Sequence, residues 1–175
     1  MSTKDLKFAI ISDVHDNLAN LNKVLDYCDN KKIKILICCG DLANMETWEY
    51  LKSKFKGKIY FVFGNMDEDY FKSEAQKKNL QEANPDVKIF YKIGEFEIEN
   101  FKIAITHFPD IANDLAKTKK YDLVFFGHTH KPTLEKQNNT LLLNPGNIAN
   151  LYYAPSFAIF DIEKNKPELI LLNEL

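Results

Sequence analysis

Short apolar runs alternate with amphipathic stretches through the first part of the chain. The runs 6–12, 33–39 and 59–63 each end in polar or glycine residues, which is typical of short buried strands. Between them, apolar residues recur at helical spacing across 18–28 and 45–55. Because strands that alternate with helices form parallel sheets, this part of the chain predicts an α/β fold.

The pattern changes after a predicted helix at 70–83. Shorter apolar runs follow, separated by Asn, Pro and Gly residues that favour turns. They predict a helix at 111–117 and strands at 87–91, 96–98, 101–106, 123–126, 134–136, 141–143, 157–162 and 168–172. We expect these strands to form a second sheet. Residues 1–175 would then be one α/β domain, a two-sheet β-sandwich flanked by helices.

Polar residues that can bind metals follow the apolar runs. The chain has four histidines, and each lies just beyond such a run. Two of them, His128 and His130, are spaced i, i+2, and we expect them to point to the same side of an emerging strand. Since the C-terminal ends of parallel strands gather in one crevice, a set of seven side chains should meet there. They are Asp13, His15, Asp41, Asn65, His107, His128 and His130.

This mixture of oxygens and imidazoles, with no thiolate, suits Mn, Fe, Zn or a similar divalent ion. Seven ligands are too many for one ion, but they satisfy two ions about 3.5–4 Å apart if one carboxylate is shared. A water that bridges two such ions loses a proton near neutral pH and can attack a phosphate ester. Each motif alone would be read as a turn or a helix cap. Their recurrence at successive strand ends favours the metal site.

The composition excludes several other classes of protein. The net charge is −2, and the lysines form no extended stripe of the kind that binds nucleic acid. All 23 basic residues are lysine, so no arginine can grip a phosphate with two hydrogen bonds. Of three cysteines, Cys38 and Cys39 lie in an apolar run and are expected to be buried free thiols. With no apolar signal region and no apolar run of ~18 residues, we expect a cytoplasmic protein without membrane segments. The sequence leaves open whether the protein forms a homo-oligomer.

The motifs Asp-x-His, Gly-Asp, Gly-Asn-x-Asp, a lone His and Gly-His-x-His occur in that order, and they resemble those of the calcineurin-like metallophosphoesterases. The short chain and the Asn-Pro-Gly turn after Gly-His-Thr-His are similar to the small prokaryotic YfcE-type phosphodiesterase branch. The resemblance implies that family's four-layer fold. It also implies hydrolysis of a small phosphoester, with a diester preferred, by two divalent ions, with Mn preferred over Fe, Zn or Ni.

The resemblance also implies the ligands of each ion. One ion would be held by Asp13, His15, Asp41 and His130. The other would be held by Asp41, Asn65, His107 and His128. Asp41 would then bridge the two ions, and Asp41, Asn65 and His107 would take part in catalysis.

Three positions depart from the family pattern. Met66 stands where many members carry a histidine that protonates the leaving group or binds the phosphate, and a thioether can do neither. Asp16 stands where Gly is usual, and with Asn17 it predicts a helix cap or a group beside the substrate. Phe108 also stands where Gly is usual. Its ring is expected either to pack against the protein or to offer a stacking face to a base or aryl group. We expect Asp67 beside the ligands as well, either supporting them or bordering the substrate.

Two other functions stay open. A eukaryotic retromer scaffold subunit shares this family's fold but has lost its metal histidines, so a binding module is one alternative. The other is a phosphomonoesterase, which Met66 and the lack of arginine disfavour. Retention of all seven ligand positions favours an enzyme, because burying such a polar cluster without metal would cost several kcal/mol.

Overall fold

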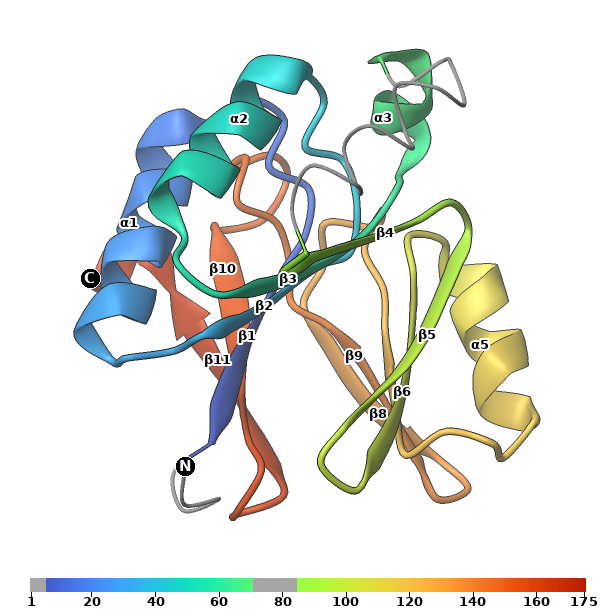
Figure 1. Cartoon of the computed structure of the whole chain (residues 1–175). Coiled ribbons are helices and arrows are strands. Elements are labelled where there is room, and N and C mark those ends of the chain that lie inside the picture. The colour runs from blue at the N-terminus through green and yellow to red at the C-terminus, as the bar shows by residue number, and fades with distance from the viewer. Residues whose placement is uncertain (1–5, 71–84) are drawn as a thin grey trace.

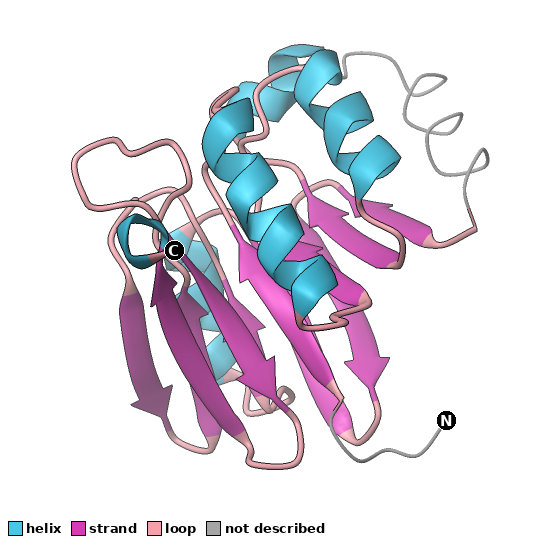
Figure 2. Cartoon of the chain, turned by 90° about the vertical axis from the view of Figure 1, so that its left-hand side faces the viewer, coloured by secondary structure: helices cyan, strands magenta, loops and turns pink. Residues whose placement is uncertain are grey.

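The computed structural model describes residues 6–70 and 85–175, and it arranges them in four layers (Figure 1). The first layer is a pair of helices, α1 (Leu18–Asn30) and α2 (Met45–Lys54). Two β-sheets pack face to face behind them, and α5 (Pro109–Lys117) covers the outer face of the second sheet. Figure 2 shows α1 and α2 side by side over the first sheet. The predicted α/β class with two facing sheets flanked by helices is confirmed.

The first sheet contains six described strands in the order β11-β10-β1-β2-β3-β4. Their bounds are β1 (Lys7–Ile11), β2 (Ile35–Cys38), β3 (Lys58–Val62), β4 (Val87–Phe90), β10 (Ser156–Asp161) and β11 (Lys166–Leu171). Strands β1 to β4 are parallel, whereas β10 pairs antiparallel with β1 and β11. The expectation that runs 87–91, 157–162 and 168–172 belong to the second sheet was therefore wrong.

The second sheet has five described strands in the order β5-β6-β7-β9-β8. Their bounds are β5 (Ile93–Ile98), β6 (Phe101–Thr106), β7 (Leu123–Phe125), β8 (Thr133–Gln137) and β9 (Thr140–Asn144). Strands β6, β7 and β9 are parallel, and α5 connects β6 to β7. Each sheet thus contributes a parallel centre whose C-terminal strand ends can carry a site.

Two short helices complete the described part, α3 (Asn65–Tyr70) and the 3₁₀ helix η1 (Leu172–Glu174). The helix predicted at 70–83 falls, apart from Tyr70, outside the described residues. No helix within the described ranges is long and apolar enough to cross a membrane.

Within residues 6–70 and 85–175, three apolar cores hold the layers together. Between the helices and the first sheet, Trp48 of α2 stacks on Phe61, with ring centroids 5.6 Å apart. Between the two sheets, Phe8 of β1 stacks on Phe160 at 5.2 Å and meets the edge of Phe125 at 5.9 Å. A smaller core lies between the second sheet and α5. Because β1 is buried on both faces, the loop that follows it is held firmly in place.

The three cysteines are all free and buried, as predicted for the Cys38-Cys39 pair. Cys28 and Cys38 lie in the core beneath the helices, and Cys39 lies between the sheets. Burial raises the pKa of the Cys28 thiol to about 12 and also raises the pKa values of Cys38 and Cys39. These thiols are therefore unreactive core residues in the native state.

Candidate metal centre

The seven predicted metal-binding residues follow the C-terminal ends of parallel strands and meet between the two sheets. Asp13, His15, Asp41 and Asn65 come after β1, β2 and β3 of the first sheet. His107 follows β6, and His128 and His130 follow β7 of the second sheet. The structure therefore brings together side chains from both sheets at one end of the sandwich.

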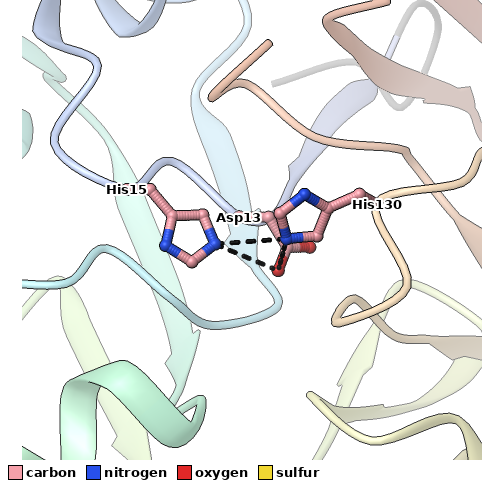
Figure 3. A group of neighbouring side chains, drawn as sticks. All are labelled: Asp13, His15 and His130. Carbon is pink, nitrogen blue, oxygen red and sulfur yellow. Dashed lines mark hydrogen bonds and ion pairs between the residues drawn. The ribbon is translucent and has the colours of Figure 1, made fainter. Parts of the chain in front are cut away.

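Three of these residues form a group that we name the first half-site: Asp13, His15 and His130 (Figure 3). The His130 Nε2 atom lies 3.4 Å from Asp13 Oδ1 and 3.2 Å from His15 Nε2. The distance from His15 Nε2 to Asp13 Oδ1 is 3.8 Å. All three donor atoms thus face a common point.

Another three residues form the second half-site: Asn65, His107 and His128. The Asn65 Oδ1 atom lies 3.2 Å from His107 Nε2 and 3.1 Å from His128 Nδ1. The two imidazole nitrogens are 3.3 Å apart. Asn65 is the first residue of α3, so a helix start rather than a free turn presents its amide oxygen.

Asp41 lies between the two half-sites. Its Oδ2 atom is 3.6 Å from His15 Nε2 in the first half-site and 3.4 Å from His107 Nε2 in the second. Its other oxygen, Oδ1, accepts a hydrogen bond of 2.9 Å from the Met66 amide. One carboxylate oxygen is thus shared by both half-sites, while the other is fixed to the backbone.

The spacing of the donor atoms fits divalent ions. Four ligands that surround an ion tetrahedrally at about 2.1 Å lie about 3.4 Å from one another. The separations range from 3.2 to 3.8 Å in the first half-site and from 3.1 to 3.3 Å in the second. The His107 ring also has the required orientation, because its Nδ1 lies 2.8 Å from the Cys39 carbonyl. An Nδ1–H that donates to this carbonyl leaves the Nε2 lone pair directed into the second half-site.

The sequence model of the calcineurin-like phosphoesterase superfamily domain matches residues 6–165. The chain belongs to this superfamily. It is 29% identical to Phosphodiesterase MJ0936 of Methanocaldococcus jannaschii over 95% of this chain and 99% of that protein.

Two solved structures share the fold. The structure of a novel archaeal phosphodiesterase is 27% identical, with a TM-score of 0.83 over 95% of this chain and 99% of that chain. At lower similarity, Vps29 from Entamoeba histolytica in complex with Zn²⁺ is 18% identical, with a TM-score of 0.65 over 96% of this chain and 100% of that chain. The second likeness concerns the fold alone.

The charges in this calcineurin-like phosphoesterase favour bound cations. Burial alone would raise the pKa of Asp13, but hydrogen bonds to His130 and His15 outweigh it and hold that pKa well below its usual range. Burial alone would lower the pKa of His107, but the neighbouring Asp41 carboxylate outweighs it and raises that pKa. A hydrogen bond to Asp13 likewise raises the pKa of His130. The Asp13 carboxylate therefore stays ionised and attracts positive charge.

Backbone geometry at the centre departs from regular structure. Asp13, His15, Asp41, His128 and His130 all have φ between 43° and 70°, which is the left-handed region. Such strained residues gather at functional sites, where the surrounding structure holds them in place. The prediction that His128 and His130 project to one side of a strand was wrong. They lie in a left-handed loop beyond β7 and reach different half-sites.

Two asparagines that sequence reasoning read only as turn residues hold this loop. The Nδ2 atom of Asn144 donates to the Gly127 carbonyl at 2.9 Å and to Thr129 Oγ1 at 3.0 Å. The Nδ2 atom of Asn147 donates to the His130 carbonyl at 3.1 Å. The available signal was that both asparagines follow an apolar run. That run is β9, which pairs with β7, so the residues after β9 lie beside the loop after β7.

The residues predicted beside the ligands have different positions. Asn17 caps α1 by accepting a hydrogen bond from the Asn20 amide at 3.0 Å. The alternative cap, Asp16, instead accepts a hydrogen bond from Thr47 Oγ1 at 2.8 Å, so that prediction was wrong. Met66 follows the half-site residue Asn65 in the chain, and 38% of its surface is exposed.

Asp67 lies beneath the centre and not at its surface. Its Oδ2 accepts hydrogen bonds from the amides of Asp41 at 2.7 Å and Gly64 at 2.8 Å, and its Oδ1 accepts one from Ala43 at 3.0 Å. Burial raises the pKa of this carboxyl to about 6 despite these bonds. Asp67 therefore ties the loop after β2 to the loop after β3 and has no oxygen free for substrate.

Proposed function

We propose that this chain is a phosphodiesterase that depends on two divalent metal ions. The observation that carries the proposal is the position of Asp41 Oδ2, within 3.6 Å of a donor nitrogen of each half-site. Asp13, His15 and His130 would hold one ion, Asn65, His107 and His128 the other, and Asp41 both. Two ions in these places would activate the attacking water and stabilise the charge that develops on the phosphoryl oxygens.

The chain's own groups prepare the centre for this reaction. The Met66 amide holds Asp41 Oδ1, which leaves Oδ2 for the shared position. The Cys39 carbonyl orients the His107 ring, and the His128 amide donates to Asp13 Oδ2 at 3.0 Å. These contacts join the two half-sites, so that ligands from both sheets keep one geometry without reorganisation.

A diester is the class of substrate that this centre suits best. A phosphodiester carries one negative charge, whereas a monoester carries up to two, and the chain has no arginine to balance the second. The 29% identity to a phosphodiesterase over nearly the whole chain supports the same class. With Met66 in place of a proton donor, esters with good leaving groups should react fastest.

The remaining assignments follow from the ligand set and the thiols. Carboxylate and amide oxygens mixed with imidazoles favour Mn²⁺, with Fe²⁺, Zn²⁺ and Ni²⁺ as alternatives. Three free, buried thiols suit a reducing compartment, so we place the enzyme in the cytoplasm. We also propose that residues 1–175 form a single catalytic domain.

The experiment compares metal content and turnover in the wild type, Asp41→Ala and Asp29→Ala. Asp29 is an exposed carboxylate on α1, so its variant is the matched control. We expect Asp41→Ala to lose both ions and all hydrolysis of bis(p-nitrophenyl) phosphate, while Asp29→Ala keeps both. Two full equivalents of metal in Asp41→Ala would contradict the shared position.

The same experiment separates an enzyme from a scaffold. A Vps29 structure contains zinc, so metal binding alone does not identify an enzyme. Turnover of a diester panel by the metal-loaded wild type decides the matter. A loaded protein that hydrolyses no ester would favour the binding module.

A further inference from the structure

The segment 147–153 lies against the first half-site and is fixed to it by backbone hydrogen bonds. The amides of Ile148 and Ala149 donate to the Asp13 carbonyl at 3.1 and 3.0 Å. Asn17 and Asn20 hold the same segment from α1, through the carbonyls of Ala149 at 3.2 Å and Ile148 at 2.8 Å. The segment therefore keeps a fixed position relative to the metal-binding residues.

One side chain, that of Asn147, shapes the turn at the end of this segment. Its Oδ1 accepts a hydrogen bond from the Leu151 amide at 3.0 Å, and its Nδ2 donates to the Tyr153 carbonyl at 3.3 Å. The Tyr153 amide also donates to the Leu151 carbonyl at 2.7 Å. Tyr152 sits at the tip of this turn, with a left-handed φ of 64° that is uncommon for a bulky residue.

Tyr152 places an uncovered aromatic ring beside the first half-site. It is 92% exposed, and its ring centroid lies 5.7 Å from that of His130, with the planes tilted by 59°. Packing does not explain this ring, because almost none of it is buried. Phe108 differs, since its ring lies within 5.1 Å of His107 and 5.5 Å of His128 and is partly buried. Of Phe108 and Tyr152, Tyr152 is the one with a free face.

We propose that Tyr152 sets the specificity of the enzyme by stacking on a planar ring of the substituent that the phosphate retains. This inference rests on the proposed phosphodiesterase function. In an in-line displacement the leaving group departs opposite the attacking water and so points away from the centre. We expect the retained ester oxygen to point to the side, so that its substituent can reach the exposed Tyr152 ring beside His130. The ring belongs to a nucleobase or to an aryl group, which have the same stacking chemistry.

Tyrosine is well suited to this role. Its ring is large and has few rotatable bonds, so little conformational entropy is lost when a ligand stacks on it. Stacking of a base on an aromatic side chain changes binding by about tenfold or more. The expected consequence is a preference for ring-bearing diesters over alkyl diesters with the same leaving group.

The test uses three diesters that release the same p-nitrophenolate: the methyl, the phenyl and the thymidine 5′ p-nitrophenyl phosphates. Wild type is compared with Tyr152→Asn, which removes the ring with a residue that tolerates left-handed backbone, and with Tyr152→Phe, which keeps the ring. Tyr153→Ala removes the neighbouring aromatic residue as a control. All four proteins are loaded with Mn²⁺ to equal content.

We expect wild type, Tyr152→Phe and Tyr153→Ala to favour the ring-bearing esters in kcat/KM by about tenfold or more over the methyl ester. Tyr152→Asn should lose this preference, mainly through KM. If Tyr152→Asn loses the preference for only one of the two ring-bearing esters, the ring of that ester is identified as the stacking partner. An unchanged preference in Tyr152→Asn, or an equal loss in Tyr152→Phe, would overturn the proposal.

A binding measurement separates this inference from the proposed function. If the loaded wild type hydrolyses none of the three esters, the proposed function fails, and equilibrium dialysis of phenyl phosphate and methyl phosphate decides the inference. Tyr152→Asn should then weaken the binding of phenyl phosphate by about tenfold and leave the binding of methyl phosphate unchanged. Equal affinities in wild type and variant would refute the stacking role.

Discussion

Met66 and Asp67 are adjacent in the sequence but serve the centre in different ways. The Met66 amide holds Asp41, and its side chain is partly exposed. The Asp67 carboxylate is fully buried and bonded to three backbone amides. A histidine placed at position 66 would therefore find no support from Asp67, and solvent or substrate would have to orient its ring.

This arrangement predicts how the rate depends on the leaving group. Without an acid at position 66, an alkyl leaving group departs as an unprotonated oxyanion, whereas nitrophenolate needs no proton. General-acid help is typically worth about 10²–10⁴-fold. We expect a steep dependence of rate on leaving-group pKa in the wild type and a shallower one in Met66→His. Because the new ring is not held in place, the gain on alkyl esters should fall near the lower end of that range.

The measurement is a series of aryl and alkyl diesters at equal metal content. Met66→Leu serves as the control, because it keeps an apolar side chain of similar volume and should keep the steep dependence. A shallow dependence in the wild type would show that another group already donates the proton.

Residue types at the centre could be predicted from the sequence, but several of their conformations could not. The seven residues do meet, because parallel strands place their C-terminal ends together. The left-handed φ values of His128 and His130 carry no signal in the apolar pattern. The cap was also ambiguous, since Asp16 and Asn17 are both good N-cap residues. Thr47, which is distant in sequence, donates a hydrogen bond to the Asp16 carboxylate, so Asn17 is the residue that accepts the helix amide.

At the scale of elements, the loop after β9 fixes the loop after β7. Asn144 is buried and donates to the Gly127 carbonyl and to Thr129, which lies between His128 and His130 in the chain. The Asn144→Ala substitution leaves this buried carbonyl without its partner, which typically costs about 1–3 kcal/mol of unfolding free energy. Loss of a group that orients a metal ligand also typically lowers metal affinity about 10–100-fold.

We therefore expect Asn144→Ala to weaken Mn²⁺ binding by about that factor while the protein stays folded. Asn139 is an exposed asparagine in the turn between β8 and β9, so Asn139→Ala should leave the affinity for Mn²⁺ unchanged. Titration of both variants by calorimetry checks the prediction. Wild-type affinity in Asn144→Ala would mean that the loop holds its histidines without this contact.

Elements themselves were easier to predict than their partners. Most described strands and helices lie close to where apolar runs and helical spacing placed them, although the short helices α3 and η1 were not predicted. The error concerned which sheet receives β4, β10 and β11. An apolar run shows that a strand is buried but does not identify its neighbour. In β10, Phe157 faces the helices while Phe160 faces the other sheet, so its pattern suits either sheet.

For the molecule as a whole, the proposed ions would cross-link the two sheets. The ligands come from loops after β1, β2 and β3 in the first sheet and after β6 and β7 in the second. The unfolded chain does not hold these residues together, so metal should bind the native state almost exclusively. Binding of this kind stabilises a fold by about 2.7 kcal/mol per site when the free ligand is at 100 times its Kd.

Two ions at that concentration would add about 5 kcal/mol, and for a chain of this size each kcal/mol raises the Tm by about 2–4 °C. We therefore expect removal of metal by a chelator to lower the wild-type Tm by about 10–20 °C, and added Mn²⁺ to restore it. Asp41→Ala should show little change in either direction, since the shared oxygen is gone.

The rate of thiol labelling gives an independent measure, because Cys28, Cys38 and Cys39 are buried in two different cores and should react only on unfolding. Added Mn²⁺ should slow this labelling in the wild type and not in Asp41→Ala. Equal stabilisation of both proteins would show that the ions bind elsewhere, and fast labelling of folded protein would show that the cores are open.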